Sequence, residues 1–163
     1  MTGVCFDAGR DHSRRLRLET LSNVLQVRPL ILEFDSMTEK TIKVPGPDHP
    51  ITIEPDKAHV VVTVAGRVIA DTRHALVLRE ASYPAVYYIP RNDVDMTLLE
   101  RTDHTTYCPY KGDCAYYSIP IGGERAVNAV WTYESPYAAV KEIAQHLAFY
   151  PSRVDSIDVQ PAG

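Results

Sequence analysis

Alternation of apolar and polar positions predicts three successive strands in the first half of the chain. The stretch HVVVTV (His59–Val64) is rich in β-branched residues, and RVIADT (Arg67–Thr72) follows after the two-residue step Ala65-Gly66. Two such runs joined by two turn residues are typical of a β-hairpin. The next run, HALVLRE (residues 74–80), lies at hairpin distance and is expected to form the third strand.

Aromatic and β-branched residues predict a second group of strands in the C-terminal half. The expected strands are YPAVYYIP at 83–90, CAYYSI at 114–119, RAVNAVWTY at 125–133 and SIDVQ at 156–160. Gly122-Gly123 is expected to be the turn between the second and the third of these. The segment HTTYCPYKGD at 104–113 is expected to be a loop, because it contains Pro109 and Gly112.

One helix is predicted near the C-terminus, where the spacing of apolar residues changes. Between Val140 and Leu147, apolar residues recur at three- and four-residue steps, which is the period of an α-helix. Ser135 has the residue type of an N-cap, and Pro136 occupies the first helical position, where its missing N–H is tolerated. We therefore expect a helix over residues 136–148.

These elements predict a mainly β fold of the α+β type, with two packed antiparallel sheets or a partly open barrel and the one C-terminal helix. The 163 residues fit a single core. The composition changes at Met37, whose context is that of an ordinary protein start. Residues 1–36 are therefore interpreted as an extension, either not native or poorly packed, and residues 37–163 as one globular domain.

Charge and hydropathy exclude several classes of partner. The formal net charge is −4 with no long run of either sign, which argues against nucleic acid because its binders carry a basic patch. No apolar stretch approaches the roughly 20 residues that span a bilayer, so no membrane partner is expected. The N-terminus has no signal-peptide pattern, and a cytoplasmic location is the expectation.

The cysteine and histidine content predicts neither a metal centre nor a cofactor. There are three cysteines and no Cys-x-x-Cys, which is too few for a four-thiolate zinc site. His59, His74 and His146 are isolated in the sequence, so no role is assigned to them. A disulfide between Cys108 and Cys114 is not expected in a reducing compartment.

Several segments, taken together, resemble one known family. They are GRVIADT, YPAVYYIPRNDVDM, DHTTYCPYKGDCAYYSI, NAVWTYESP and HLAFYPSRVD, and the block Cys108-Pro109-Tyr110-Lys111-Gly112 is the most specific part. From about residue 41 to residue 159 the chain resembles the bacterial family named domain of unknown function 427 (DUF427). The resemblance implies a compact, mostly antiparallel β domain with one C-terminal helix. That family has also carried the label of a nucleotidyltransferase domain, but the resemblance implies no established reaction.

The loop from Cys108 to Lys111 is a candidate catalytic site. A thiolate is nucleophilic when its pKa is lowered, and a nearby ammonium lowers it. With His104 as a base, these residues would form a Cys/His/Lys constellation. The alternatives are that Cys108 is a small buried hydrophobic residue and Lys111 a solvated charge, or that Lys111 attracts an anionic ligand.

Paired aromatic residues on the expected strands indicate a binding cleft. Neighbours on a strand face opposite ways, so each pair sends one ring inward and one outward. Outward rings would stack on an aromatic or cationic ligand, and the alternative is cross-strand packing that only stabilises the sheet. The ligand-binding residues that we predict are Lys111, Tyr88, Tyr116, Trp131, Tyr133, Glu80, Arg79 and Asn128.

Asp93 and Asp95 are the only residues that support the nucleotidyltransferase label. Two carboxylates spaced in this way share one face of a strand and would hold Mg²⁺ beside a nucleoside triphosphate. The Gly-Ser turn that should precede such a pair is missing from the sequence. The alternative is that Asp93 caps a turn after Pro90.

We therefore expect a small-molecule-binding or accessory protein, with an aromatic cleft and an anion-attracting Lys111, that takes a small polar or anionic ligand. One alternative is an enzyme that uses the Cys108 to Lys111 loop, including a nucleotidyltransferase-like one. The other is a protein-interaction module that uses an exposed sheet edge or a tyrosine face.

Overall fold

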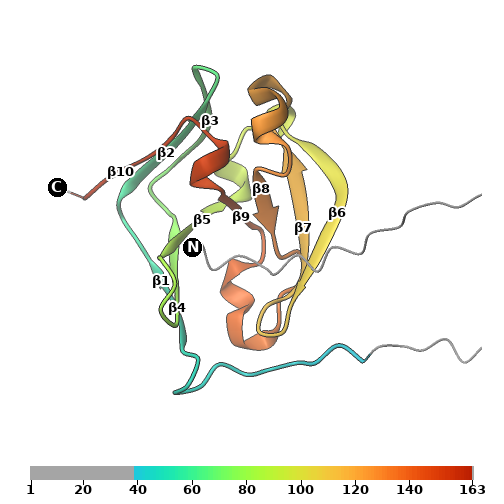
Figure 1. Cartoon of the computed structure of the whole chain (residues 1–163). Coiled ribbons are helices and arrows are strands. Elements are labelled where there is room, and N and C mark those ends of the chain that lie inside the picture. Colours follow the sequence, from blue (N-terminus) through green and yellow to red (C-terminus); the bar gives the residue numbers. More distant parts are fainter. Residues whose placement is uncertain (1–38, 163) are drawn as a thin grey trace, which may run out of the picture.

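The computed structural model describes residues 39–162 and contains two antiparallel sheets (Figure 1). The larger sheet has the strand order β1-β4-β5-β9-β8-β7-β6, and the smaller one has the order β10-β2-β3. The expected mainly β fold with two packed sheets is confirmed, and the sheets do not close into a barrel. The expected extension, residues 1–36, lies outside the described residues.

The strands of both sheets are short. Those of the seven-stranded sheet are β1 (Ile51–Pro55), β4 (Leu76–Glu80), β5 (Val86–Pro90), β6 (Glu100–Cys108), β7 (Gly112–Ser118), β8 (Val130–Thr132) and β9 (His146–Phe149). Those of the three-stranded sheet are β2 (His59–Val64), β3 (Arg67–Thr72) and β10 (Ser156–Gln160). In Figure 1 the smaller sheet lies to one side of β6, β7 and β8, and β5 and β9 lie between them.

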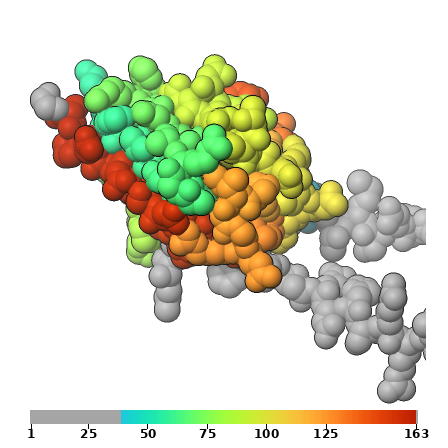
Figure 2. All heavy atoms as spheres, turned by 90° about the horizontal axis from the view of Figure 1, so that it is seen from above, coloured from blue at the N-terminus to red at the C-terminus, as the bar shows by residue number. Residues whose placement is uncertain are grey.

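The hairpin of β2 and β3 has the predicted bounds. Ala65 and Gly66 both have positive φ, at 48° and 73°, which is the geometry of a type I′ two-residue turn. Val60, Val62 and Val64 are fully buried, so the alternation of the sequence points one face of β2 into the core. The tip of this hairpin packs against the segment Pro120–Ala126, as Figure 2 shows from above.

The predicted C-terminal helix is wrong over most of its length. A 3-10 helix, η4 (Ala138–Ile143), takes the first part, and the strand β9 takes the second part. The backbone turns at Gln145, whose φ is +60°. Strand β9 pairs with both β5 and β8, and such a central strand is apolar on both faces, so its sequence does not alternate.

Two further segments differ from the prediction. Residues 120–126 form a 3-10 helix, η3 (Pro120–Ala126), in place of a tight Gly122-Gly123 hairpin turn, because Pro120 starts a helical turn here. Strand β6 continues to Cys108 and β7 begins at Gly112, so seven of the ten residues of the expected loop at 104–113 are strand. The remaining short helices are all of the 3-10 type: η1 (Arg91–Asp93), η2 (Met96–Leu98) and η5 (Pro151–Arg153). No helix in residues 39–162 is long and apolar enough to cross a membrane.

Both faces of the central strands are buried, each in its own core. The inter-sheet core joins the valines of β2 to Ile89, Val130, Leu147 and Phe149 of the large sheet. The second core, on the opposite face, contains Tyr88, Tyr116, Trp131 and Tyr133 and is covered by Val140 and Ile143 of η4. Adjacent residues such as Val130 and Trp131 therefore belong to different cores, as the alternation of a strand requires.

Candidate functional site

A buried ion pair joins two of the residues that the sequence singled out. The Nζ atom of Lys111 donates to Oε2 of Glu80, and both side chains are more than nine-tenths buried. The other carboxylate oxygen, Oε1, lies 2.9 Å from Nε2 of His49. The His49 ring in turn stacks on Tyr110, with ring centroids 4.1 Å apart. Glu80 therefore holds a buried lysine on one side and a half-buried histidine on the other.

The turn between β6 and β7 fixes the backbone of Lys111. Its N–H donates to the Cys108 carbonyl at 3.2 Å, and its carbonyl accepts from the Tyr137 N–H at 3.1 Å. Gly112 has a φ of +104°, a conformation that favours glycine, and this sharp turn starts β7 directly after the lysine. The ammonium is thus directed into the protein and not into solvent.

The ammonium of Lys111 already has an anionic partner from its own chain. The expectation that Lys111 attracts an external anion assumed that its positive charge has no partner in the chain. The carboxylate of Glu80 neutralises that charge. Lys111 is therefore part of a salt bridge within the chain and is not a solvated charge. Glu80 is equally occupied, because both of its carboxylate oxygens have a partner.

The structure does not bring His104 to Cys108. Both lie on the continuous strand β6, and four residues of strand separate them by about 13 Å. His104 instead packs its ring on Tyr116, with centroids 4.5 Å apart. Cys108 and Cys114 are both buried, at 8% and 1% exposure.

A pair of tyrosines flanks the same turn. The hydroxyl of Tyr107 lies 2.9 Å from that of Tyr137 and donates to the Thr41 carbonyl at 2.8 Å. Loss of solvent around the phenol, together with the bond to Tyr137, raises the pKa of Tyr107 to about 12. The Tyr107 phenol therefore stays neutral, and its hydrogen bond holds the segment near Thr41 against β6.

The four rings of the expected aromatic cleft form core in place of an open cleft. Tyr88, Tyr116, Trp131 and Tyr133 are each at most 4% exposed. The indole N–H of Trp131 donates to the Tyr88 hydroxyl at 3.2 Å, and the two rings meet edge to face. Cross-strand packing, the alternative interpretation of these residues, accounts for this arrangement.

Arg79 and Asn128 lie apart from these rings. Arg79 is exposed on β4, 3.9 Å from Glu54 of β1. Asn128 accepts from the Thr102 hydroxyl at 2.7 Å and has a φ of +52°, which asparagine tolerates better than most residues. Both therefore have local structural contacts.

A pocket that the sequence did not reveal lies between the two sheets, at a place where residues of both cores border it. Its volume is about 300 Å³, and we call it the inter-sheet pocket. The rings of Trp131 and Tyr150, 4.5 Å apart, form part of its wall. The lining consists of Val62, Pro84, Ala85, Val86, Tyr87, Ile89, Trp131, Phe149, Tyr150, Pro151, Ile157 and Val159. The lining is almost entirely apolar. Only the way in which β10 and β2 lie over β5 and β9 creates it, so no local sequence signal could have located it.

A second, polar hollow of about 590 Å³ lies where η1, β6, β7 and β8 meet. We call it the arginine hollow, because Arg91 and Arg101 both reach the Tyr117 ring region from different elements. It is lined by Arg91, Met96, Leu99, Arg101, Tyr117, Thr132, Glu134 and Gln145. The hydrogen bond to Glu134 raises the pKa of Arg101 above its usual range, so this guanidinium is always charged.

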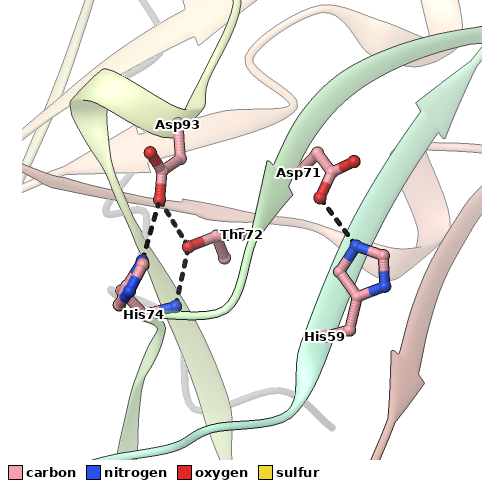
Figure 3. A network of polar contacts seen from close by, with 5 residues as sticks. All are labelled: His59, Asp71, Thr72, His74 and Asp93. Carbon is pink, nitrogen blue, oxygen red and sulfur yellow. Dashed lines mark hydrogen bonds and ion pairs between the residues drawn. The ribbon is translucent and has the colours of Figure 1, made fainter.

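Asp93 and Asp95, the pair that would hold Mg²⁺ under the nucleotidyltransferase label, are used in local structure. Asp93 accepts from the Thr72 hydroxyl at 2.6 Å and lies 3.9 Å from Nδ1 of His74 (Figure 3). Asp95 is the N-cap of η2 and accepts from the Thr97 N–H at 3.1 Å. Asp95 is thus a helix cap, whereas Asp93 is the last residue of η1 and caps neither of its ends. The nucleotidyltransferase interpretation gains no support from either residue.

Figure 3 also shows His59 of β2 beside Asp71 of β3, with Nε2 2.7 Å from Oδ1. This pair ties the two strands of the hairpin at their open end. Within residues 39–162, no three His, Cys, Asp or Glu side chains are arranged to hold a metal ion.

One family model matches this chain, and it is described as a domain of unknown function (DUF427). The match covers residues 52–160, from β1 to the end of β10, which is well over half of the chain. The chain belongs to the DUF427 family. The expected resemblance is thereby confirmed. A comparison of this DUF427 chain with curated proteins finds no match.

Proposed function

We propose that this DUF427 protein binds a small, planar and mainly apolar molecule in the inter-sheet pocket. The supporting observation is the pocket itself, which has an almost entirely apolar lining and a volume of about 300 Å³. Small-molecule sites are typically concave, mostly apolar and pre-formed, and they begin at about this size. Burial of apolar area would supply the affinity, at about 25 cal/mol per Å² removed from water.

The ring pair of Trp131 and Tyr150 favours a flat ligand. The two rings are tilted by 52° and both border the pocket. Trp131 is only 4% exposed, so a planar molecule would stack on the half-buried ring of Tyr150 and touch the exposed part of Trp131. The indole N–H already donates to Tyr88, so Trp131 offers the pocket only its apolar surface. The expected aromatic site is therefore proposed here with Trp131 retained and with Tyr87, Phe149 and Tyr150 added.

Tryptophan fluorescence tests this proposal directly, because Trp131 is the only tryptophan of the chain. We expect a flat bicyclic aromatic probe such as quinoline to change the intensity or wavelength of Trp131 emission in a saturable way. Native mass spectrometry of freshly purified protein should also show a retained small molecule.

A variant with a filled pocket mouth provides the comparison. Ala85 is exposed at the rim of the pocket, so Ala85→Phe should weaken binding of the probe by tenfold or more without changing the melting temperature. Val68→Phe, at an exposed position of β3 outside the pocket, is the matched control and should bind normally. Equal affinity of all three proteins, or the absence of any saturable signal, would refute the proposal.

A further inference from the structure

The arginine hollow combines two cations with a hydroxyl group. Arg91 donates from Nη1 to the Tyr117 hydroxyl at 3.2 Å, and its guanidinium carbon lies 5.7 Å from the centre of the Tyr117 ring. Arg101 approaches from β6 and pairs with Glu134. Because the Tyr117 oxygen accepts from an arginine, the hydroxyl hydrogen is available for an acceptor placed in the hollow.

The charge of the hollow is opposite in sign to that of the chain. Two guanidiniums and one carboxylate line it, and the chain as a whole carries −4. Within residues 39–162, the guanidinium of Arg91 has no carboxylate within 4.0 Å, in contrast to Lys111, which is neutralised by Glu80. The hollow is thus a place where positive charge is concentrated and only partly compensated.

The backbone of the hollow is also held in place. The Arg91 N–H donates to the Gln145 carbonyl at 2.9 Å, and Gln145 itself has a φ of +60°. A left-handed conformation at a residue other than glycine is uncommon and tends to occur at functional sites. The Thr132 hydroxyl donates to the His146 carbonyl at 2.7 Å, a bond that holds β8 to β9 beside the hollow.

We propose that the arginine hollow binds the oxyanion group of a small molecule, a carboxylate or a phosphate. Guanidinium groups present several donors in a rigid fork that matches both kinds of oxyanion. Arg91 and Arg101 would donate from two sides and Tyr117 from a third. The hollow is large enough for a molecule that carries the anion. This site shares no residue with the inter-sheet pocket, so it goes beyond the function proposed above.

Titration calorimetry of the whole chain with inorganic phosphate, pyrophosphate and succinate tests the proposal at low ionic strength. We expect Arg91→Gln and Arg101→Gln each to weaken binding of the preferred anion by about tenfold or more, which is the scale of one charge-assisted hydrogen bond. Arg79→Gln removes an equal charge at an exposed position near Glu54 and should have little effect. A preference for succinate over phosphate identifies a carboxylate ligand, and the reverse preference identifies a phosphate.

The substitution Glu134→Gln provides a test of opposite sign. It removes the only carboxylate of the hollow and releases Arg101, so anion binding should tighten several-fold. A merely structural role of these residues would predict weaker binding or none. The proposal is refuted if no anion binds, if Arg79→Gln weakens binding as much as Arg91→Gln does, or if Glu134→Gln fails to tighten it. Ala85→Phe should leave anion binding unchanged, so failure at one site is distinguishable from failure at the other.

Discussion

A buried charge pair is the least ordinary feature at the scale of single residues. Lys111 and Glu80 are 31 residues apart in the sequence, and each would be costly to bury alone. The sequence singled out Lys111 because it belongs to the Cys108 to Gly112 block, which contains Pro109 and Gly112. The sequence could not show that the partner is Glu80, because that contact depends on how β4 packs near the β6–β7 turn.

The pair predicts a strong and non-additive effect of substitution on stability. Lys111→Met leaves the Glu80 carboxylate buried without its main partner, so the free energy of unfolding should fall by about 3–5 kcal/mol. The double variant Glu80→Leu with Lys111→Met should be more stable than Lys111→Met alone, because no charge is then left uncompensated. Urea unfolding measures both.

The exposed pair of Arg79 and Glu54 is the control for this prediction. Arg79 neighbours Glu80 on β4 but is more than half exposed, so Arg79→Gln should cost less than about 1 kcal/mol. If Arg79→Gln and Lys111→Met lower the free energy of unfolding equally, the buried pair does not contribute more to stability than the exposed one, and the prediction is wrong.

At the scale of elements, the sequence predicted the local hairpins better than the segments whose form depends on distant partners. The hairpin of β2 and β3 carries its own turn chemistry and alternation, so its bounds agree with the prediction. Strand β9 carries helix-like spacing, and only its pairing with β5 and β8 decides its conformation. Tertiary contacts therefore override the local period at residues 146–149.

The turn of the β2–β3 hairpin predicts two opposite changes in stability. Ala65 has a φ of +48°, which asparagine adopts more easily than alanine, so Ala65→Asn should raise the free energy of unfolding by about 0.5–1 kcal/mol. Gly66→Ala should lower it by about 1 kcal/mol. A Cβ at Gly66 would meet no atom within 4 Å, so the loss would report on the backbone alone. Thermal melts of both variants give the test, and effects of the same sign would contradict it.

At the scale of the whole molecule, function is expected where separate elements meet. The inter-sheet pocket takes residues from both sheets, and the arginine hollow takes residues from η1 and several strands. The sequence indicated Trp131 because aromatic residues are paired on its strand, but it gave no sign of Arg91 or Arg101. Neither arginine belongs to a local motif, and their proximity arises only from the packing of β6, β7 and the η1 turn.

Domain organisation gives a prediction at the same scale. The composition changes at Met37, and the DUF427 match starts at residue 52. A chain that starts at Met37 should therefore melt within a few degrees of the full chain, because residues 1–36 are expected to lie outside the core. Parallel thermal melts and urea titrations measure the difference. A loss of more than about 2 kcal/mol, which is large against typical domain stability, would show that the extension belongs to the core.

Strand β6 stands at one end of the strand order, so in the part of the chain that the structure describes only β7 pairs with it. An open strand edge is a template on which other copies of a protein aggregate. Here the edge carries Glu100, Arg101 and Asp103, and its register with β7 is interrupted between Arg101 and Thr105. Charge and irregularity of this kind oppose the regular stacking of strands that leads to fibrils. We therefore expect the same charged edge that contributes Arg101 to the arginine hollow also to help the protein stay dispersed at high concentration.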